Sequence, residues 1–190
     1  MRYALGTIIG TALLGLAKSK SGGRNVYRPR KIEDIYNISP QKKALITGIN
    51  LSGKYLAQTP DDIFDGFTKL KWLWLEDNQL TELPNSIGNL TNLEKLWLVN
   101  NQLTELPQSI GNLTNLKKLN LRGNRLTELP QSIGNFTNLE RIWLDSNPWE
   151  KPVPKKIIFK MISNRVHKNV IETIIRLNNS IANKSNLRIR

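Results

Sequence analysis

Leu70-Lys-Trp-Leu-Trp-Leu-Glu-Asp-Asn-Gln-Leu-Thr-Glu-Leu-Pro84 is the stretch that decides the fold, because it returns at intervals of 23 residues. Its copies start at Leu93, at Leu116 and, in an incomplete form, at Leu139. Residues 46–63 form a weaker copy at an offset of 24. Self-similarity at a fixed period of this length indicates a stacked array of one supersecondary unit.

The physical meaning of the repeat follows from its letters. The alternation around Leu73 and Leu75 predicts a short strand with one buried face. Five such strands, centred near residues 50, 74, 97, 120 and 143, would stack in parallel about 4.8 Å apart. Asn78 and its equivalents fall where the chain turns out of each strand, and a buried amide there can bond backbone groups that have no sheet partner. Pro84 and its equivalents fix φ at the start of the return segment. One repeat cannot bury its leucines alone, so neighbours must stack.

The resulting pattern, LxxLxLxxNxLxxLPxxIxxLxN, resembles the leucine-rich-repeat family. It is similar to the short intracellular kind found in Ras-group scaffold proteins and in many bacterial repeat proteins. The resemblance covers about residues 44–150. It implies an α/β fold, a right-handed leucine-rich-repeat solenoid or horseshoe of about five repeats with a parallel concave sheet and a C-terminal helical cap.

Charge divides the chain into three parts, whose values add to the total of +13. Residues 1–43 carry a net charge of +7, residues 44–150 carry −3, and residues 151–190 carry +9. With the apolar and proline patterns, this division predicts an apolar targeting or anchor segment (1–20), a basic linker (21–31), an N-terminal cap (32–45), the leucine-rich repeats (46–149), a C-terminal helical cap (150–182) and a disordered basic tail (183–190).

The first segment has an uncharged run over residues 3–17, which is shorter than the ~20 residues that a spanning helix needs. Gly15 and Ala17 would suit a signal-peptide cleavage site, but Lys18 and Lys20 follow at once and oppose export. The lack of acids before Glu33 also suits an organelle transit peptide. We rank a membrane anchor or targeting segment first and a disordered tail second. The expected location is intracellular, with membrane association through this segment, and secretion ranks below it.

The C-terminal part has apolar residues every three or four positions from Ile158 to Ile181, which predicts an amphipathic helix or helix pair. Its other face is basic. One interpretation is a cap that shields the last leucines from water. The other is a basic helix that lies on an anionic membrane. The cap is preferred, because every solenoid end needs a cover.

The repeats differ from one another mainly on the strands, and function is expected where they differ. If the leucines point inward, the alternate strand positions stand on the concave face. They form columns of tryptophans and cations across it. The predicted partner-binding residues are Trp72, Trp74, Trp97, Trp143, Lys95, Lys118, Arg122 and Arg141. Tryptophan and arginine are enriched in binding hot spots, although cross-strand stabilisation alone would also explain the pairs.

Catalysis is not expected. The sequence has no cysteine and a single histidine, His167, among basic neighbours, with no nucleophile motif, phosphate loop or metal-ligand cluster. No cofactor, metal or small-molecule substrate is expected. The hypothesis is a non-catalytic protein-interaction module or scaffold whose partner has an acidic region. The alternative is salt-sensitive binding of nucleic acid, or of an anionic membrane through the basic face and the termini, with nucleic acid ranked lower.

Overall fold

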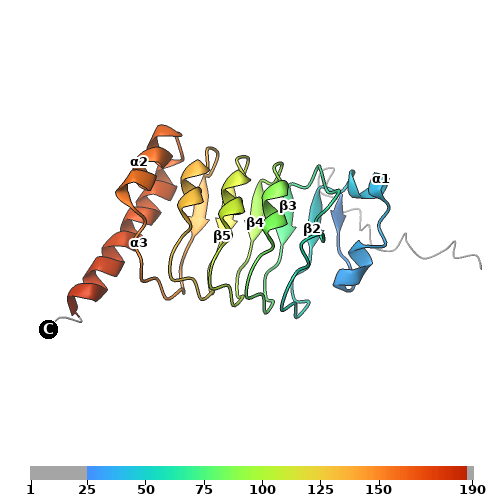
Figure 1. Ribbon diagram of the computed structural model, residues 1–190, viewed down its shortest axis with the longest axis horizontal. Coiled ribbons are helices and arrows are strands. Elements are labelled where there is room, and N and C mark those ends of the chain that lie inside the picture. Colours follow the sequence, from blue (N-terminus) through green and yellow to red (C-terminus); the bar gives the residue numbers. More distant parts are fainter. Residues whose placement is uncertain (1–24, 188–190) are drawn as a thin grey trace, which may run out of the picture.

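A six-stranded parallel sheet runs through the protein, with its strands side by side in chain order (Figure 1). The computed structural model describes residues 25–187, so the expected anchor over residues 1–20 lies outside the described part. The strands are β1 (Val26–Tyr27), β2 (Gly48–Asn50), β3 (Trp72–Trp74), β4 (Lys95–Trp97), β5 (Lys118–Asn120) and β6 (Arg141–Trp143). Every neighbouring pair is parallel, so the chain returns between strands on the other side of the sheet.

The register of the sheet follows the sequence repeat. Leu73 pairs with Leu96, and Leu96 pairs with Leu119, each a step of one period. Between β2 and β3 the step is one residue longer, since Ile49 pairs with Leu73. In the loop between these strands Gly66 has a φ of +83°, a conformation that glycine adopts without steric cost. The predicted parallel stack of repeats is confirmed.

The sheet has one strand more than the five expected, because β1 pairs with β2. The expectation of a basic linker over residues 21–31 is therefore wrong for Val26 and Tyr27. The Asn25 carbonyl accepts hydrogen bonds from the N–H groups of Thr47 and Gly48, and Tyr27 packs against the core. A two-residue edge strand without a leucine has too short a pattern to be distinguished from a linker in the sequence.

A ladder of asparagines closes the corner after each strand. The Asn78 amide donates to the carbonyls of Leu51 at 2.9 Å and Leu75 at 3.0 Å, and its Oδ1 accepts from the Lys54 N–H at 2.9 Å. Equivalent bonds recur one and two repeats later, and the buried members of the ladder are Asn78, Asn101 and Asn124. The predicted role of these asparagines is confirmed.

The return segments carry 3₁₀ helices, which lie side by side on the other face of the sheet (Figure 1). These helices are η2 (Asn85–Asn89), η3 (Gln108–Asn112) and η4 (Gln131–Asn135). Each begins directly after a proline with φ of −66°, −64° or −65°, the value that the proline ring imposes. An isoleucine of each helix is buried in the core, as its place in the repeat predicts.

The close approach of these helices explains the glycines of η2 and η3, Gly88 and Gly111. A Cβ on Gly111 would lie 2.5 Å from the Ser132 carbonyl oxygen, which belongs to the next helix. We therefore expect Gly111→Ala to lower the free energy of unfolding by about 1–3 kcal/mol, measured by urea denaturation, because the two backbones must move apart.

Gly134 provides the matched control, because it is the equivalent glycine of the last repeat. A Cβ there meets only side chains, the nearest at 3.2 Å on Ile157. Gly134→Ala should cost clearly less than Gly111→Ala, and equal losses would contradict the backbone-spacing explanation.

Short helices precede the first complete repeat. They are η1 (Ile32–Ile35) and α1 (Pro40–Lys43). Ile35 is fully buried in the core cluster, and Ile32 and Ile38 pack against it. This part of the chain covers the first end of the core, which is the role proposed for the N-terminal cap.

Two helices lie at the other end, α2 (Lys155–Ser163) and α3 (Lys168–Leu187) (Figure 1). Helix α2 packs against η4, and α3 packs against β6 and α2. Their inward side chains, including Ile157, Met161 and Ile174, are part of the hydrophobic core. The predicted helical C-terminal part is thus confirmed.

The prediction placed the start of the disordered tail too early in the chain. Residues 183–190 were assigned to it by their polar composition, but α3 continues through Leu187. Ile181 still contacts the core, and the last turns extend the same helix beyond it, with the Ser185 hydroxyl donating to the Ile181 carbonyl at 3.1 Å. Residues 188–190 lie outside the described part.

Candidate functional site

The face of the sheet opposite the 3₁₀ helices carries the predicted binding residues. We call it the sheet face, meaning the outward side chains of β2–β6 and of the residues directly flanking them. The central column runs through Asn50, Trp74, Trp97, Asn120 and Trp143, which are register partners. The neighbouring column runs through Gly48, Trp72, Lys95, Lys118 and Arg141. Tryptophans and cations thus form columns across the strands, as the alternation in the sequence predicts.

Two of the tryptophans form a stacked pair. Trp74 and Trp97 stack with their centroids 5.5 Å apart and their planes 12° from parallel. Lys95 Nζ lies 5.9 Å from the centroid of the Trp97 ring. Offset stacking and a cation over an indole each stabilise such a cluster by about 1 kcal/mol. All the tryptophans on the sheet face are half-buried, so part of each ring is open to solvent.

The cluster of tryptophans continues towards β2 and ends at β5. A Cβ on Gly48 would lie 3.1 Å from Trp74 Cζ3 and 3.5 Å from Trp72 Cε3, so these two rings lie over the bare backbone of β2. On the other side Asn120 is interposed between Trp97 and Trp143. Of the four predicted tryptophans, Trp143 is therefore apart from the stack.

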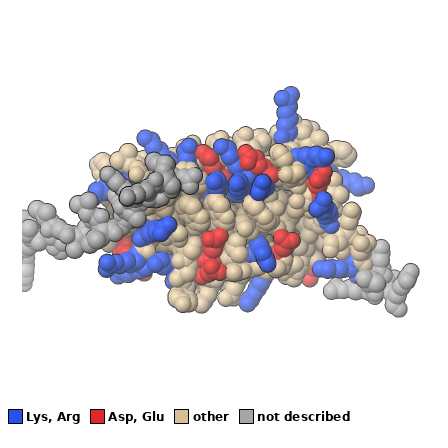
Figure 2. Space-filling model, turned by 180° about the vertical axis from the view of Figure 1, so that it is seen from behind, with Lys and Arg blue, Asp and Glu red and all other residues tan. Residues whose placement is uncertain are grey.

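The cations form a row beside the stack. Lys95, Lys118 and Arg141 are consecutive register partners, and the first two are half-buried while Arg141 is exposed. Arg122, two residues beyond β5, is also exposed. Figure 2 shows a cluster of blue atoms near the centre of this face, with red atoms on both sides of it.

A charge ladder lies directly before the strands. Glu94 makes ion pairs with Lys71 at 3.0 Å and with Lys117 at 3.1 Å. Burial alone would raise the pKa of Glu94, but the hydrogen bonds from these two lysines outweigh it and hold the pKa below its usual value. Glu94 thus remains charged at neutral pH and fixes the lysines on either side of it.

Acids also border the opposite edge, directly after the strands. Glu76 is half-buried, and its pKa is raised by burial and, to a smaller extent, by the neighbouring Asp77. Asp145 occupies the same register position beyond β6 and is exposed. The cationic row of the sheet face is therefore bounded by carboxylates at both margins.

Comparison with known proteins decides the family. A family model described as a leucine-rich repeat region matches residues 61–160, which is more than half of the chain. This chain belongs to the leucine-rich-repeat family. A solved leucine-rich-repeat protein of Leptospira interrogans is similar to it, with 35% sequence identity and a TM-score of 0.59. The match covers 64% of this chain but only 30% of that protein. No curated protein matches the chain.

Leucine-rich repeats generally mediate protein–protein interaction and are typically not enzymatic. Within residues 25–187 of this leucine-rich-repeat protein, no group of three or more His, Asp or Glu side chains is placed to hold a metal ion. His167 is exposed, and its Nδ1 accepts a hydrogen bond from the Asn169 N–H at 3.2 Å at the start of α3. Over the same residues, no helix has both the length and the apolar character that crossing a bilayer requires.

Two features of this leucine-rich-repeat surface were not predicted from the sequence. The first is the ladder of Lys71, Glu94 and Lys117, whose signal is the alternation of charge at the position before each strand. The second is a cluster of cations at the first end of the sheet, where residues after β1 meet residues after β2.

Proposed function

We propose that this protein is a non-catalytic interaction module that binds a protein partner on its sheet face. The observation that carries the proposal is the half-exposed Trp74–Trp97 stack with Lys95 beside it. Tryptophan and arginine are enriched in binding hot spots, and tryptophan buries a large area at a small entropic cost. A rigid parallel sheet holds these side chains in fixed positions, which further limits the entropy lost on binding.

The row of Lys95, Lys118 and Arg141 supports a partner with an acidic region. These cations follow each other on consecutive strands, which lie about 4.8 Å apart. Carboxylates of a partner segment that crosses the strands would meet one cation after another. Such charge pairs mainly raise the association rate and fix the orientation of the partner.

Nucleic acid is disfavoured by the acids at the margin that follows the strands. A phosphate backbone laid along the cations would approach Glu76 or Asp145 there. Like charges close to each other weaken binding. Binding of nucleic acid or of an anionic membrane, with the segment 1–20 as a tether, is the alternative that the experiment must distinguish from binding of a protein.

The test is a quantitative pull-down from the native cell with the wild type and a Trp74→Ala/Trp97→Ala/Trp143→Ala variant. We expect a protein to be retained by the wild type, to survive moderate salt and to be lost with the variant. Removing one hot-spot residue costs about 2 kcal/mol or more, so the triple variant should bind at least about 30-fold more weakly.

Phe159→Ala is the matched control, because Phe159 is an aromatic residue that is 67% exposed on α2, away from the sheet face. It should retain the partner like the wild type. Circular dichroism must show that all variants are folded. Equal retention by the wild type and the triple variant would refute the proposal, and so would recovery of only salt-sensitive nucleic acid or lipid.

A further inference from the structure

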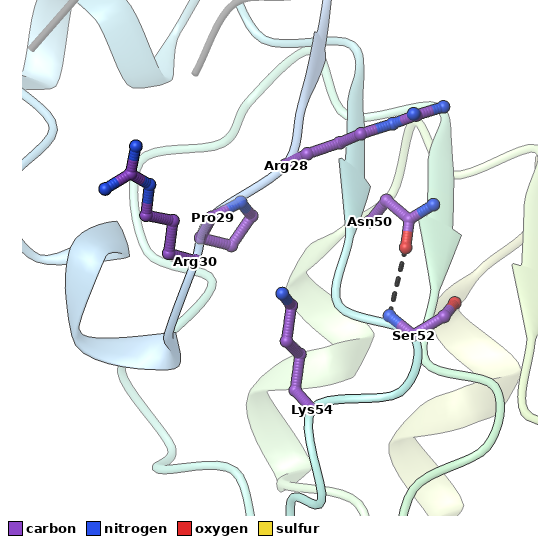
Figure 3. A pocket seen from close by; sticks show the side chains of 6 residues that line it. All are labelled: Arg28, Pro29, Arg30, Asn50, Ser52 and Lys54. Atoms are coloured by element: carbon purple, nitrogen blue, oxygen red, sulfur yellow. Dashed lines mark hydrogen bonds between the residues drawn. The ribbon is translucent and has the colours of Figure 1, made fainter. Parts of the chain in front are cut away.

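We propose that a cationic cavity at the first end of the sheet binds a phosphate dianion, either free or carried by a monoester. The cavity has a volume of about 280 Å³. It is lined by Arg28, Pro29, Arg30, Asn50, Ser52 and Lys54 (Figure 3). None of these residues belongs to the proposed partner-binding set, so this inference goes beyond the proposed function.

The cavity lies where two neighbouring parallel strands end. Arg28 directly follows β1, and Asn50 is the last residue of β2. Parallel strands present their carboxyl ends at the same edge, so the residues after β1 and those after β2 lie side by side. Within residues 25–187 the short β1 is the outermost strand, so β2 has no complete repeat on that side.

The charged side chains that line the cavity are all positive. Among the ion pairs of the described residues, none involves Arg28, Arg30 or Lys54. The chain has no acid before Glu33, so residues 1–24 cannot supply a carboxylate side chain. The nearby Asp34 does not line the cavity, and its Oδ2 accepts from the backbone N–H of Arg30 at 2.9 Å and of Lys31 at 3.1 Å.

The directions of the cations fit mutual repulsion. In Figure 3 the side chain of Arg28 extends over Asn50, Arg30 points away on the other side, and Lys54 rises between them. Like charges in a shared cavity repel, and long side chains relieve this by pointing apart. An anion in the cavity would reverse the sign of that interaction and draw the three cationic groups inward.

The floor of the cavity is rigid. The Lys54 N–H donates to Oδ1 of the buried Asn78 at 2.9 Å, and the Gly53 N–H donates to the Glu76 carbonyl at 3.0 Å. Asn50 Oδ1 accepts from the Ser52 N–H at 3.0 Å, which turns the amide nitrogen of Asn50 outward as a donor (Figure 3). A ligand thus meets a preformed floor and needs to order only the long side chains.

Phosphate fits this group of donors better than a carboxylate does. Three cations exceed the single charge of a carboxylate, whereas a phosphate monoester carries nearly two charges and three acceptor oxygens. Guanidinium groups bind such oxygens in pairs, and lysine adds a point charge. The cavity is slightly smaller than the 300–1,000 Å³ of ordinary ligand sites, so it suits one small anionic group and not a whole cofactor.

The test is an NMR titration of the full chain with inorganic phosphate, phenyl phosphate and benzoate at constant ionic strength. We expect both phosphates to shift the amide signals of Ser52, Gly53 and Lys54, and benzoate to leave them almost unchanged. Tighter binding of phenyl phosphate indicates a monoester as the natural source. Equal binding of the two indicates free phosphate.

Two variants that lose the same number of positive charges distinguish phosphate binding in the cavity from nonspecific attraction of phosphate to a basic protein. Arg28→Gln/Arg30→Gln/Lys54→Gln should weaken phosphate binding at least about tenfold, since each lost charge-assisted hydrogen bond matters. Lys69→Gln/Lys155→Gln/Lys156→Gln removes three exposed cations elsewhere and should bind like the wild type. If the first variant is not folded, Lys54→Gln alone replaces it. Equal weakening in both variants, equal shifts with benzoate, or no shift at these amides would overturn the proposal.

Discussion

Replacing Asn101 with alanine is expected to lower the free energy of unfolding by about 1–3 kcal/mol. Its amide donates to the carbonyls of Leu75 at 2.9 Å and Leu98 at 3.2 Å, and its Oδ1 accepts from the Leu80 N–H at 3.1 Å. In the alanine variant the carbonyls of Leu75 and Leu98 keep the bonds from Asn78 and Asn124, but the buried Leu80 N–H loses its partner. A buried group without a partner costs about 1–3 kcal/mol. Urea denaturation followed by circular dichroism measures the loss.

The neighbouring Asn100 gives the matched control. It is exposed, and its amide donates to Asp77 Oδ1 at 2.9 Å on the surface. Because its φ is +53°, the control variant should be Asn100→Gly, which keeps that conformation without strain. We expect a change within about 1 kcal/mol. A comparable loss in both variants would mean that the buried ladder contributes no special stability.

The asparagine ladder and the sheet were predictable because the residues that form them recur in every repeat. Leu73, Asn78 and Pro84 recur at one spacing, and stacking requires that equivalent residues become neighbours. The strand β1 was not predictable by this route, since Val26 and Tyr27 contain no letter of the repeat. Its position depends on the Asn25 carbonyl reaching Thr47 and Gly48, a contact that only the folded chain creates.

The sheet face was predictable in its columns but not in its details. Alternation alone places Trp74 beside Trp97, yet it does not determine that their rings stack. The stack depends on the small Gly48, over which the Trp74 ring lies. The cationic cavity is harder still to predict from the sequence. Arg28 and Lys54 come from two segments that only the pairing of β1 with β2 brings together.

Ile174→Ala is expected to lower the free energy of unfolding by about 2–5 kcal/mol, measured by urea denaturation. Ile174 is fully buried in the core cluster, on the helix that packs against β6. The alanine variant loses this burial and leaves a cavity between α3 and the last repeat. Since neighbouring repeats stabilise each other, the loss at this end should spread to the repeat beneath it.

A variant of the adjacent Ile175 distinguishes the two interpretations of α3, as a cap of the core or as a helix that lies on a membrane. Ile175 is 43% exposed on the same turn of α3. Ile175→Ala should change the free energy of unfolding by about 0.5 kcal/mol or less. If the helix served mainly to lie on lipid, the exposed isoleucine would instead govern binding to anionic vesicles, and Ile174→Ala would barely affect stability in water. A large loss for Ile174 with a small one for Ile175 therefore assigns the apolar stripe of α3 to the core. Any membrane contact at this end would then have to use the exposed basic side of the helices, because the buried stripe could not reach lipid without unfolding the last repeat.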